Sequence, residues 1–67
     1  MNEKKANIKL TLYTVKEAAE ELRVSTWMIY RLLRSNQLKS LTIASRRLIS
    51  FDDLMDFVKQ RKGDYYG

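Results

Sequence analysis

The sequence predicts a small α+β domain of three short helices and a two-stranded β-hairpin. This prediction rests on three observations. Several segments combine a capping residue with apolar residues at helical spacing, and one segment alternates apolar and polar residues. The length of 67 residues allows a single domain. The domain is expected at residues 12–62, followed by a tail at residues 63–67. Residues 1–11 are expected to form a flexible arm or a short strand, because apolar and polar residues alternate there at Ile8, Leu10 and Leu12.

The first helix is expected at residues 15–22. Thr14 and Glu17 have the spacing of a capping box, in which the threonine hydroxyl accepts from the Glu17 amide and the glutamate carboxylate accepts from the Thr14 amide. One apolar stripe follows at helical spacing, formed by Val15, Ala18, Ala19 and Leu22. Its alanines would let another helix cross closely.

A second helix is expected at residues 26–35, after a short turn at Arg23 and Val24. Ser25 is a favourable N-cap, and Asn36 tolerates the left-handed conformation with which helices often end. The expected buried stripe is Ile29, Leu32 and Leu33. Two helices joined by a tight turn, the first with a small-residue face and the second basic, are typical of a helix-turn-helix.

A β-hairpin is expected to follow. Leu41 and Ile43 alternate with polar residues, and Leu48 and Ile49 supply the returning strand. Residues 44–47 are expected to form a tip longer than two residues, because they lack the glycine typical of tight hairpin turns. If Ile49 is buried, strict alternation exposes Leu48.

The third helix is expected to begin after Ser50, a capping residue. Asp52 and Asp53 lie in its first turn, where the helix dipole favours acids, and Gly63 is expected to end it. Its apolar face would consist of Leu54, Phe57 and Val58.

Charge is segregated along the chain. Residues 22–51 hold no Asp or Glu, and all eight acids lie outside this window, while the net charge is +5. The basic residues inside it are Arg23, Arg31, Arg34, Lys39, Arg46 and Arg47. Typical soluble surfaces intersperse both signs, so this arrangement favours a polyanionic partner over a merely solvated basic face.

The composition excludes several kinds of chemistry. The chain has no Cys or His, so disulfides, imidazole–metal sites and Ser–His or Cys–His nucleophiles are absent. Its two glycines, Gly63 and Gly67, form no phosphate-binding loop. With neither an apolar run of about 18 residues nor a signal-peptide stretch, a cytoplasmic, non-enzymatic binding domain without metal, cofactor or small-molecule ligand is expected.

Two groups of residues are candidates for contact with nucleic acid. A helix in the major groove presents its first turn and one outer stripe to base edges, and arginine can bond two acceptors on guanine. The hairpin tip would reach the backbone or the minor groove. The candidates are Ser25, Thr26, Trp27, Tyr30, Arg31, Arg34, Ser45, Arg46 and Arg47.

Each candidate also has a purely structural interpretation. Trp27 and Tyr30 could pack against the domain, and Arg31 and Arg34 could simply solvate their helix. Neighbouring strand residues point to opposite faces, so either Arg46 or Arg47 could lie on the domain.

Several segments carry a family resemblance, namely residues 13–22, 24–26 and 29–34, then Leu38, Ile43, Ser45-Arg46-Arg47, Ile49 and Asp53-Leu54. Over about residues 12–60, the chain resembles the excisionase-type branch of the MerR-like winged helix-turn-helix DNA-binding domains. Glycine is usual in that family where Asn36 and Ala44 stand, an aromatic residue where Arg47 stands, and a polar or basic residue at Leu48.

The resemblance implies that the second helix enters the major groove of double-stranded DNA and the wing enters an adjacent minor groove. It assigns helix contacts to Ser25, Thr26, Trp27, Tyr30, Arg31 and Arg34, and wing contacts to Ser45 and Arg46. Small free-standing members resemble recombination directionality factors of phages and integrative elements, which bend DNA and help an integrase excise the element. Expected partners are therefore a tyrosine-type integrase and neighbouring copies of the chain.

Two other functions stay open at this point. A small phage or plasmid transcription regulator would use the same DNA-binding surface. A protein-interaction adaptor would instead use the apolar and tyrosine-rich C-terminus, from Phe57 to Tyr66.

Overall fold

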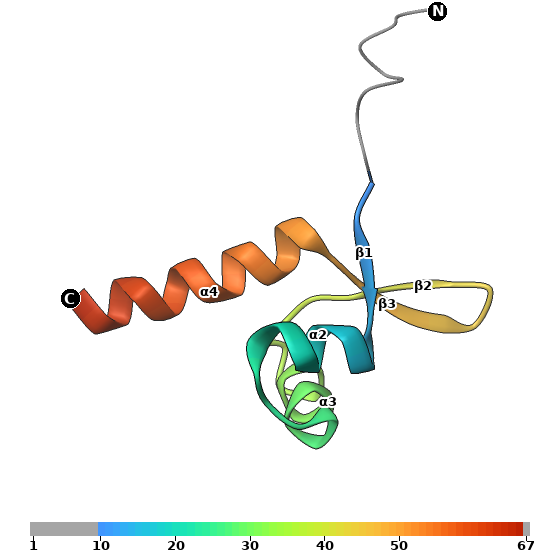
Figure 1. The fold of residues 1–67 in the computed structure, drawn as a ribbon, viewed down its shortest axis with the longest axis horizontal. Helices are drawn as coiled ribbons and strands as arrows, with labels where there is room; N and C mark the ends of the chain where they lie inside the picture. Colours follow the sequence, from blue (N-terminus) through green and yellow to red (C-terminus); the bar gives the residue numbers. More distant parts are fainter. Residues whose placement is uncertain (1–9, 67) are drawn as a thin grey trace, which may run out of the picture.

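The computed structural model describes residues 10–66, and side chains for residues 10–62. The described residues form three helices and a small antiparallel sheet; α2 and α3 lie together, and α4 runs in a different direction from them (Figure 1). The elements are β1 (Leu12–Thr14), α2 (Val15–Leu22), α3 (Thr26–Arg34), β2 (Leu41–Ile43), β3 (Arg46–Ser50) and α4 (Phe51–Tyr66). The predicted α+β class is confirmed, whereas the prediction at Ile8 lies outside the described residues.

The sheet has three strands rather than the expected two. Their order is β1-β3-β2, and both pairings are antiparallel, with Tyr13 opposite Ile49 and Leu41 opposite Leu48. The additional strand, β1, lies at residues 12–14. The alternation at Ile8, Leu10 and Leu12 had indicated an arm or a short strand within residues 1–11, and the described strand instead begins at Leu12. Its pairing with β3, which is distant in sequence, could not be read from a local pattern.

The hairpin tip is a two-residue turn, so the prediction of a longer loop is wrong. Ala44 and Ser45 have φ angles of 51° and 68°, and Ile43 lies opposite Arg46. Two consecutive positive φ angles are the pattern of a type I′ turn, whose twist matches that of the flanking strands. The strand register therefore imposes a tight turn even without glycine.

The helices of the helix-turn-helix begin at the predicted caps. The Glu17 amide donates to Thr14 Oγ1 at 3.1 Å, and the Thr14 amide donates to Glu17 Oε1 at 2.9 Å. The Met28 amide donates to Ser25 Oγ at 3.1 Å. Helix α2 has the predicted bounds, while α3 ends at Arg34, one residue early, before left-handed Asn36 at φ 61°.

Helix α4 begins as predicted but ends later. Ser50 Oγ accepts from the Asp53 amide at 3.0 Å, which caps the first turn. The prediction that Gly63 ends this helix is wrong, because α4 continues to Tyr66. A glycine inside a helix costs about 1 kcal/mol relative to alanine, which is too little by itself to end the helix.

The core lies where α2, α3, β3 and the start of α4 meet. It includes the predicted stripe of α3, that of α2 except for half-buried Leu22, and Ile49 of the returning strand. Leu38, at 2% exposure, anchors the segment between α3 and β2. The buried residues are Val15, Ala18, Ala19, Ile29, Leu32, Leu33, Leu38, Ile49 and Leu54. This packing fixes how α3 is rotated about its own axis.

Candidate nucleic-acid interface

The buried residues of α3 determine which side of the helix faces outward. Ile29 is fully buried, and Leu32 and Leu33 are nearly so. Helical geometry then places the residues at 27, 30, 31 and 34 on the opposite side. This side, called the outward stripe below, consists of Trp27, Tyr30, Arg31 and Arg34, all exposed.

The two aromatic residues of the outward stripe do not belong to the core. The exposed fraction is 60% for Trp27 and 46% for Tyr30. Of the two interpretations left open for Trp27, the exposed one describes the structure. Large exposed aromatic side chains are costly to leave in water, so their presence beside arginines indicates a contact surface.

Within the outward stripe, Arg31 stacks on Trp27. The guanidinium carbon of Arg31 lies 5.5 Å from the centroid of the Trp27 ring. The two residues are four apart, so they are neighbours on the helix surface. This distance is within the range of a cation–π interaction.

Ser25 and Thr26 lie at the N-terminus of α3, and both are exposed. The Ser25 hydroxyl is occupied in part, because it caps the Met28 amide. The first-turn amides that lack partners inside a helix are donors for an anion such as a phosphate. This end of α3 therefore continues the outward stripe.

The wing, β2 and β3 with their turn, carries the remaining predicted residues. Ser45 occupies the turn, and Arg46 and Arg47 begin β3. Arg47 shares a sheet face with buried Ile49, and Arg46 lies on the opposite face, yet both arginines are exposed. Figure 1 shows the wing projecting from the core separately from α3.

Leu48 corrects an expectation based on strict alternation. Ile49 is fully buried, as assumed, but Leu48 is half-buried rather than exposed. It lies between Thr14 of β1 and Leu41 of β2. Because β3 is the central strand, neighbouring strands on both sides shield Leu48 from solvent. The same residue on an edge strand would be more exposed.

Ile43 is a surface residue of the wing that the sequence analysis did not assign to the interface. It lies directly opposite Arg46, beside the turn, and 48% of its surface is exposed. Alternation grouped it with Leu41 but could not show that β2 is an edge strand. A branched apolar residue at a wing tip can contact sugars or base edges in a minor groove.

Acids are kept away from the outward stripe and the wing. The window from residue 22 to 51 has no carboxylate, while Glu17, Glu20 and Glu21 lie exposed on α2. The side chains of Arg34, Arg46 and Arg47 have no carboxylate partner among residues 10–62. Their charge is therefore available to phosphates.

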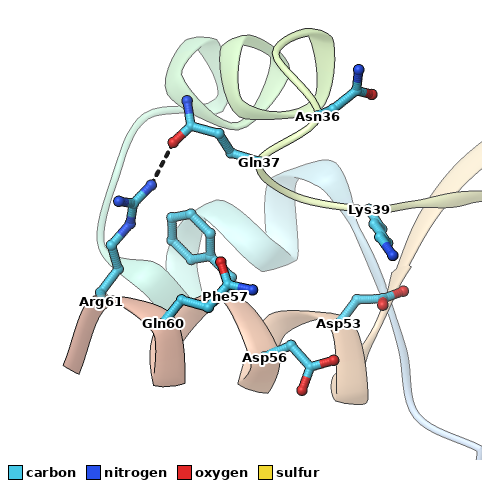
Figure 2. A pocket seen from close by; sticks show the side chains of 8 residues that line it. All are labelled: Asn36, Gln37, Lys39, Asp53, Asp56, Phe57, Gln60 and Arg61. Carbon is cyan, nitrogen blue, oxygen red and sulfur yellow. Dashed lines mark hydrogen bonds between the residues drawn. The ribbon is translucent and has the colours of Figure 1, made fainter. Parts of the chain in front are cut away.

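A hollow of about 340 Å³ lies between α4 and the segment after α3 (Figure 2). Its charges are mixed, because Lys39, Arg61, Asp53 and Asp56 all line it. Figure 2 shows Lys39 near Asp53, while Arg61 points toward Gln37. Among the described residues, no cluster of three metal-binding side chains occurs. Helices long and apolar enough to cross a bilayer are likewise not found in the described part of the chain.

Comparison with known proteins identifies the architecture. The family model described as "Helix-turn-helix domain" matches residues 12–62, from β1 into α4. The chain belongs to this family. The helix-turn-helix family consists of small excisionase-like DNA-binding domains, so the resemblance inferred from the sequence is confirmed. No curated protein and no solved structure gave a match.

Membership of the helix-turn-helix family supports sequence-specific DNA binding and a non-enzymatic role. In a helix-turn-helix the second of the two helices is the recognition helix, and here this helix is α3. The individual contact residues stay predictions, and the structure presents all nine of them at exposed positions.

Proposed function

We propose that this helix-turn-helix protein is an excisionase, or recombination directionality factor, of bacterial or phage origin. It would bind and bend attachment-site DNA in the cytoplasm and promote excision of a mobile element by an integrase. The observation that carries the proposal is the outward stripe of α3, which combines two exposed aromatic rings with two arginines. The excisionase-like family supports the more specific role.

The two surfaces suggest a division of labour on the duplex. The outward stripe enters the major groove, where Arg31 and Arg34 can each bond the two acceptors of a guanine. The amides at Ser25 and Thr26 hold a phosphate at the groove edge. The wing lies in an adjacent minor groove, with Arg46 on the backbone and Ile43 against the groove wall. Simultaneous occupation of both grooves favours bent DNA.

The electrostatic part of this proposal has a quantitative test. We expect about five to seven phosphates to be neutralised, which gives a slope of about −5 to −6 in a plot of log affinity against log salt concentration. Fluorescence anisotropy with a labelled duplex would measure it. A slope close to zero would contradict a DNA-binding surface.

The excisionase role needs an assay of recombination. The purified chain would be combined with the tyrosine integrase of its own element and a plasmid carrying both attachment ends. We expect excision to depend on the chain and to disappear when Arg31 and Arg34 are both replaced by alanine. Lys16→Ala on α2 is the control, because it also removes an exposed positive charge but lies on a different helix from the outward stripe. Promoter repression without excision would favour the transcription regulator.

Contacts with integrase or with neighbouring copies are proposed for α4, whose C-terminal end lies beyond the core (Figure 1). Its apolar residues Phe51, Met55 and Val58 line a shallow surface hollow together with Tyr13 and Leu22. Truncation after Lys62 removes the last turn of α4.

Three properties of the truncated chain distinguish integrase from neighbouring copies as the partner of α4: affinity for a single DNA site, cooperativity on several sites, and excision. Retained affinity for a single site with lost cooperativity on several sites would indicate contacts between neighbouring copies. Retained cooperativity with lost excision would indicate integrase. If all three measurements are unchanged, α4 beyond Lys62 has no part in these contacts.

A further inference from the structure

The outward stripe of α3 consists of aromatic and arginine side chains, and Trp27 and Arg31 are one of each in contact. Trp27 precedes Arg31 by four residues, and the guanidinium carbon lies 5.5 Å from the ring centroid. With 60% of its surface exposed, Trp27 is not explained by burial in the core. Its position in the first turn of α3 is also where recognition helices approach base edges.

Arg34 provides a comparison on the same stripe. It is exposed like Arg31, but it stacks on no ring among the described residues. The two arginines therefore differ in how far their side chains are restricted before DNA is bound. An unrestricted arginine loses more rotamer freedom on binding, which weakens the contact it makes.

We propose that Trp27 is a positioning residue that holds Arg31 ready to read a guanine in the major groove. This inference rests on the proposed DNA-binding function and adds the element that sets its specificity. The guanidinium group lies over the Trp27 ring, and a cation–π contact uses none of its N–H donors, so they stay free to donate to both guanine acceptors. Trp27 would thus sharpen sequence preference without itself supplying a charge.

The test is selection from a random duplex library with the full chain and four variants. The variants are Trp27→Ala, Trp27→Phe, Arg31→Ala and the Trp27→Ala/Arg31→Ala double variant. Arg31→Ala should lower the preference for guanine at one position by about 5- to 150-fold. Trp27→Ala should lower the preference at that same position by about two- to fivefold, the range of an exposed cation–π pair.

Three further results are expected from the same selections. Trp27→Phe should retain most of the preference, because phenylalanine keeps an aromatic face. Adding Trp27→Ala to Arg31→Ala should change nothing more at that position. In Trp27→Ala, the preference read by Arg34 should stay as in the parent chain. Separate salt titrations of this variant should give an unchanged slope, because tryptophan carries no charge.

Two outcomes would overturn the positioning role. A loss that is uniform over all sequences would make Trp27 a direct backbone contact. An equal loss in the presence and absence of Arg31 would show that Trp27 acts independently of that arginine.

A measurement without DNA separates this inference from the proposed function. In the free protein, the ring current of Trp27 should shift the Arg31 side-chain protons upfield in NMR spectra, and Trp27→Ala should abolish the shift. An absent shift alongside normal DNA binding would overturn the stack alone. If the Arg31 protons show the expected upfield shift but the protein binds no duplex, the proposed DNA-binding function is wrong. The role of Arg31 in reading guanine is then wrong as well.

Discussion

Arg61 of α4 donates a hydrogen bond to the side-chain oxygen of Gln37, in the segment just after the recognition helix (Figure 2). The guanidinium carbon of Arg61 also lies 4.8 Å from the centroid of the Phe57 ring. The amide group of Gln37 in turn donates to Ser35 Oγ at 2.9 Å. This chain of contacts fastens α4 to the end of α3, so the two elements proposed for protein and DNA contacts are mechanically connected.

Breaking the Arg61–Gln37 contact should loosen this connection modestly. Both side chains are exposed, so we expect a coupling free energy of about 0.5–1 kcal/mol in a double-mutant cycle of Arg61→Ala and Gln37→Ala. Urea unfolding of the four proteins would measure it. The same cycle with exposed Lys59→Ala in place of Arg61→Ala is the control and should give no coupling. Equal values in the two cycles would show that the contact has no energetic role.

The hairpin turn is expected to be strained at Ala44, which has φ 51°. A left-handed conformation costs a residue with a Cβ about 1–2 kcal/mol, and glycine avoids this cost. Glycine also makes the unfolded chain more flexible, which offsets part of the gain in folding free energy. Ala44→Gly should therefore stabilise the protein by about 0.5–1 kcal/mol and raise Tm by about 2–8 °C. Calorimetry would measure both. Ala44→Val should act in the opposite direction, and stabilisation by valine would exclude a left-handed residue at this position.

The capping box of α2 should contribute measurably to folding. Thr14→Ala removes the hydroxyl that accepts from the Glu17 amide, and we expect a loss of about 1 kcal/mol of unfolding free energy. Thr14→Ser keeps the hydroxyl and is the matched control, expected to lose less than half as much. Chemical denaturation followed by circular dichroism would compare them. Similar losses for both variants would mean that the methyl group matters, through packing of β1, rather than the cap.

The sequence predicted the helix-turn-helix because its signals are local. Thr14 and Ser25 each cap the helix that follows them, and the periodic apolar residues of both helices are buried, apart from half-buried Leu22. The window without Asp or Glu likewise indicated a basic surface on the second helix. Because one side of that helix is buried, its remaining residues have to face outward. In these parts, propensity, capping and periodicity agree with the tertiary structure.

The remaining features depend on long-range pairing, which a local pattern cannot show. β1 becomes a strand because Tyr13 meets Ile49, and this pairing also half-buries Leu48. Register forces Ala44 and Ser45 into a two-residue turn that their own preferences disfavour. The stack of Arg31 on Trp27 depends on side-chain rotamers, so spacing permits it but does not establish it.

The two wing arginines should differ in their contribution to DNA binding. Arg46 directly follows the turn and lies opposite exposed Ile43, whereas Arg47 shares the sheet face of buried Ile49. A phosphate contact by Arg46 predicts that Arg46→Gln makes the salt slope about 0.9 units less negative while sequence preference stays the same. Arg47→Gln, with the same loss of charge, should change the slope by less than half a unit.

Salt titrations of both variants on one duplex would compare the arginines directly. Because the two substitutions alter net charge equally, any difference between them reports position rather than total charge. A larger change in salt slope for Arg47→Gln than for Arg46→Gln would show that the sheet face carrying Arg47, not that of Arg46, contacts the duplex. Equal changes would instead place both side chains beside phosphates, which the opposite faces of β3 allow only if the wing tip lies inside the groove between two backbones.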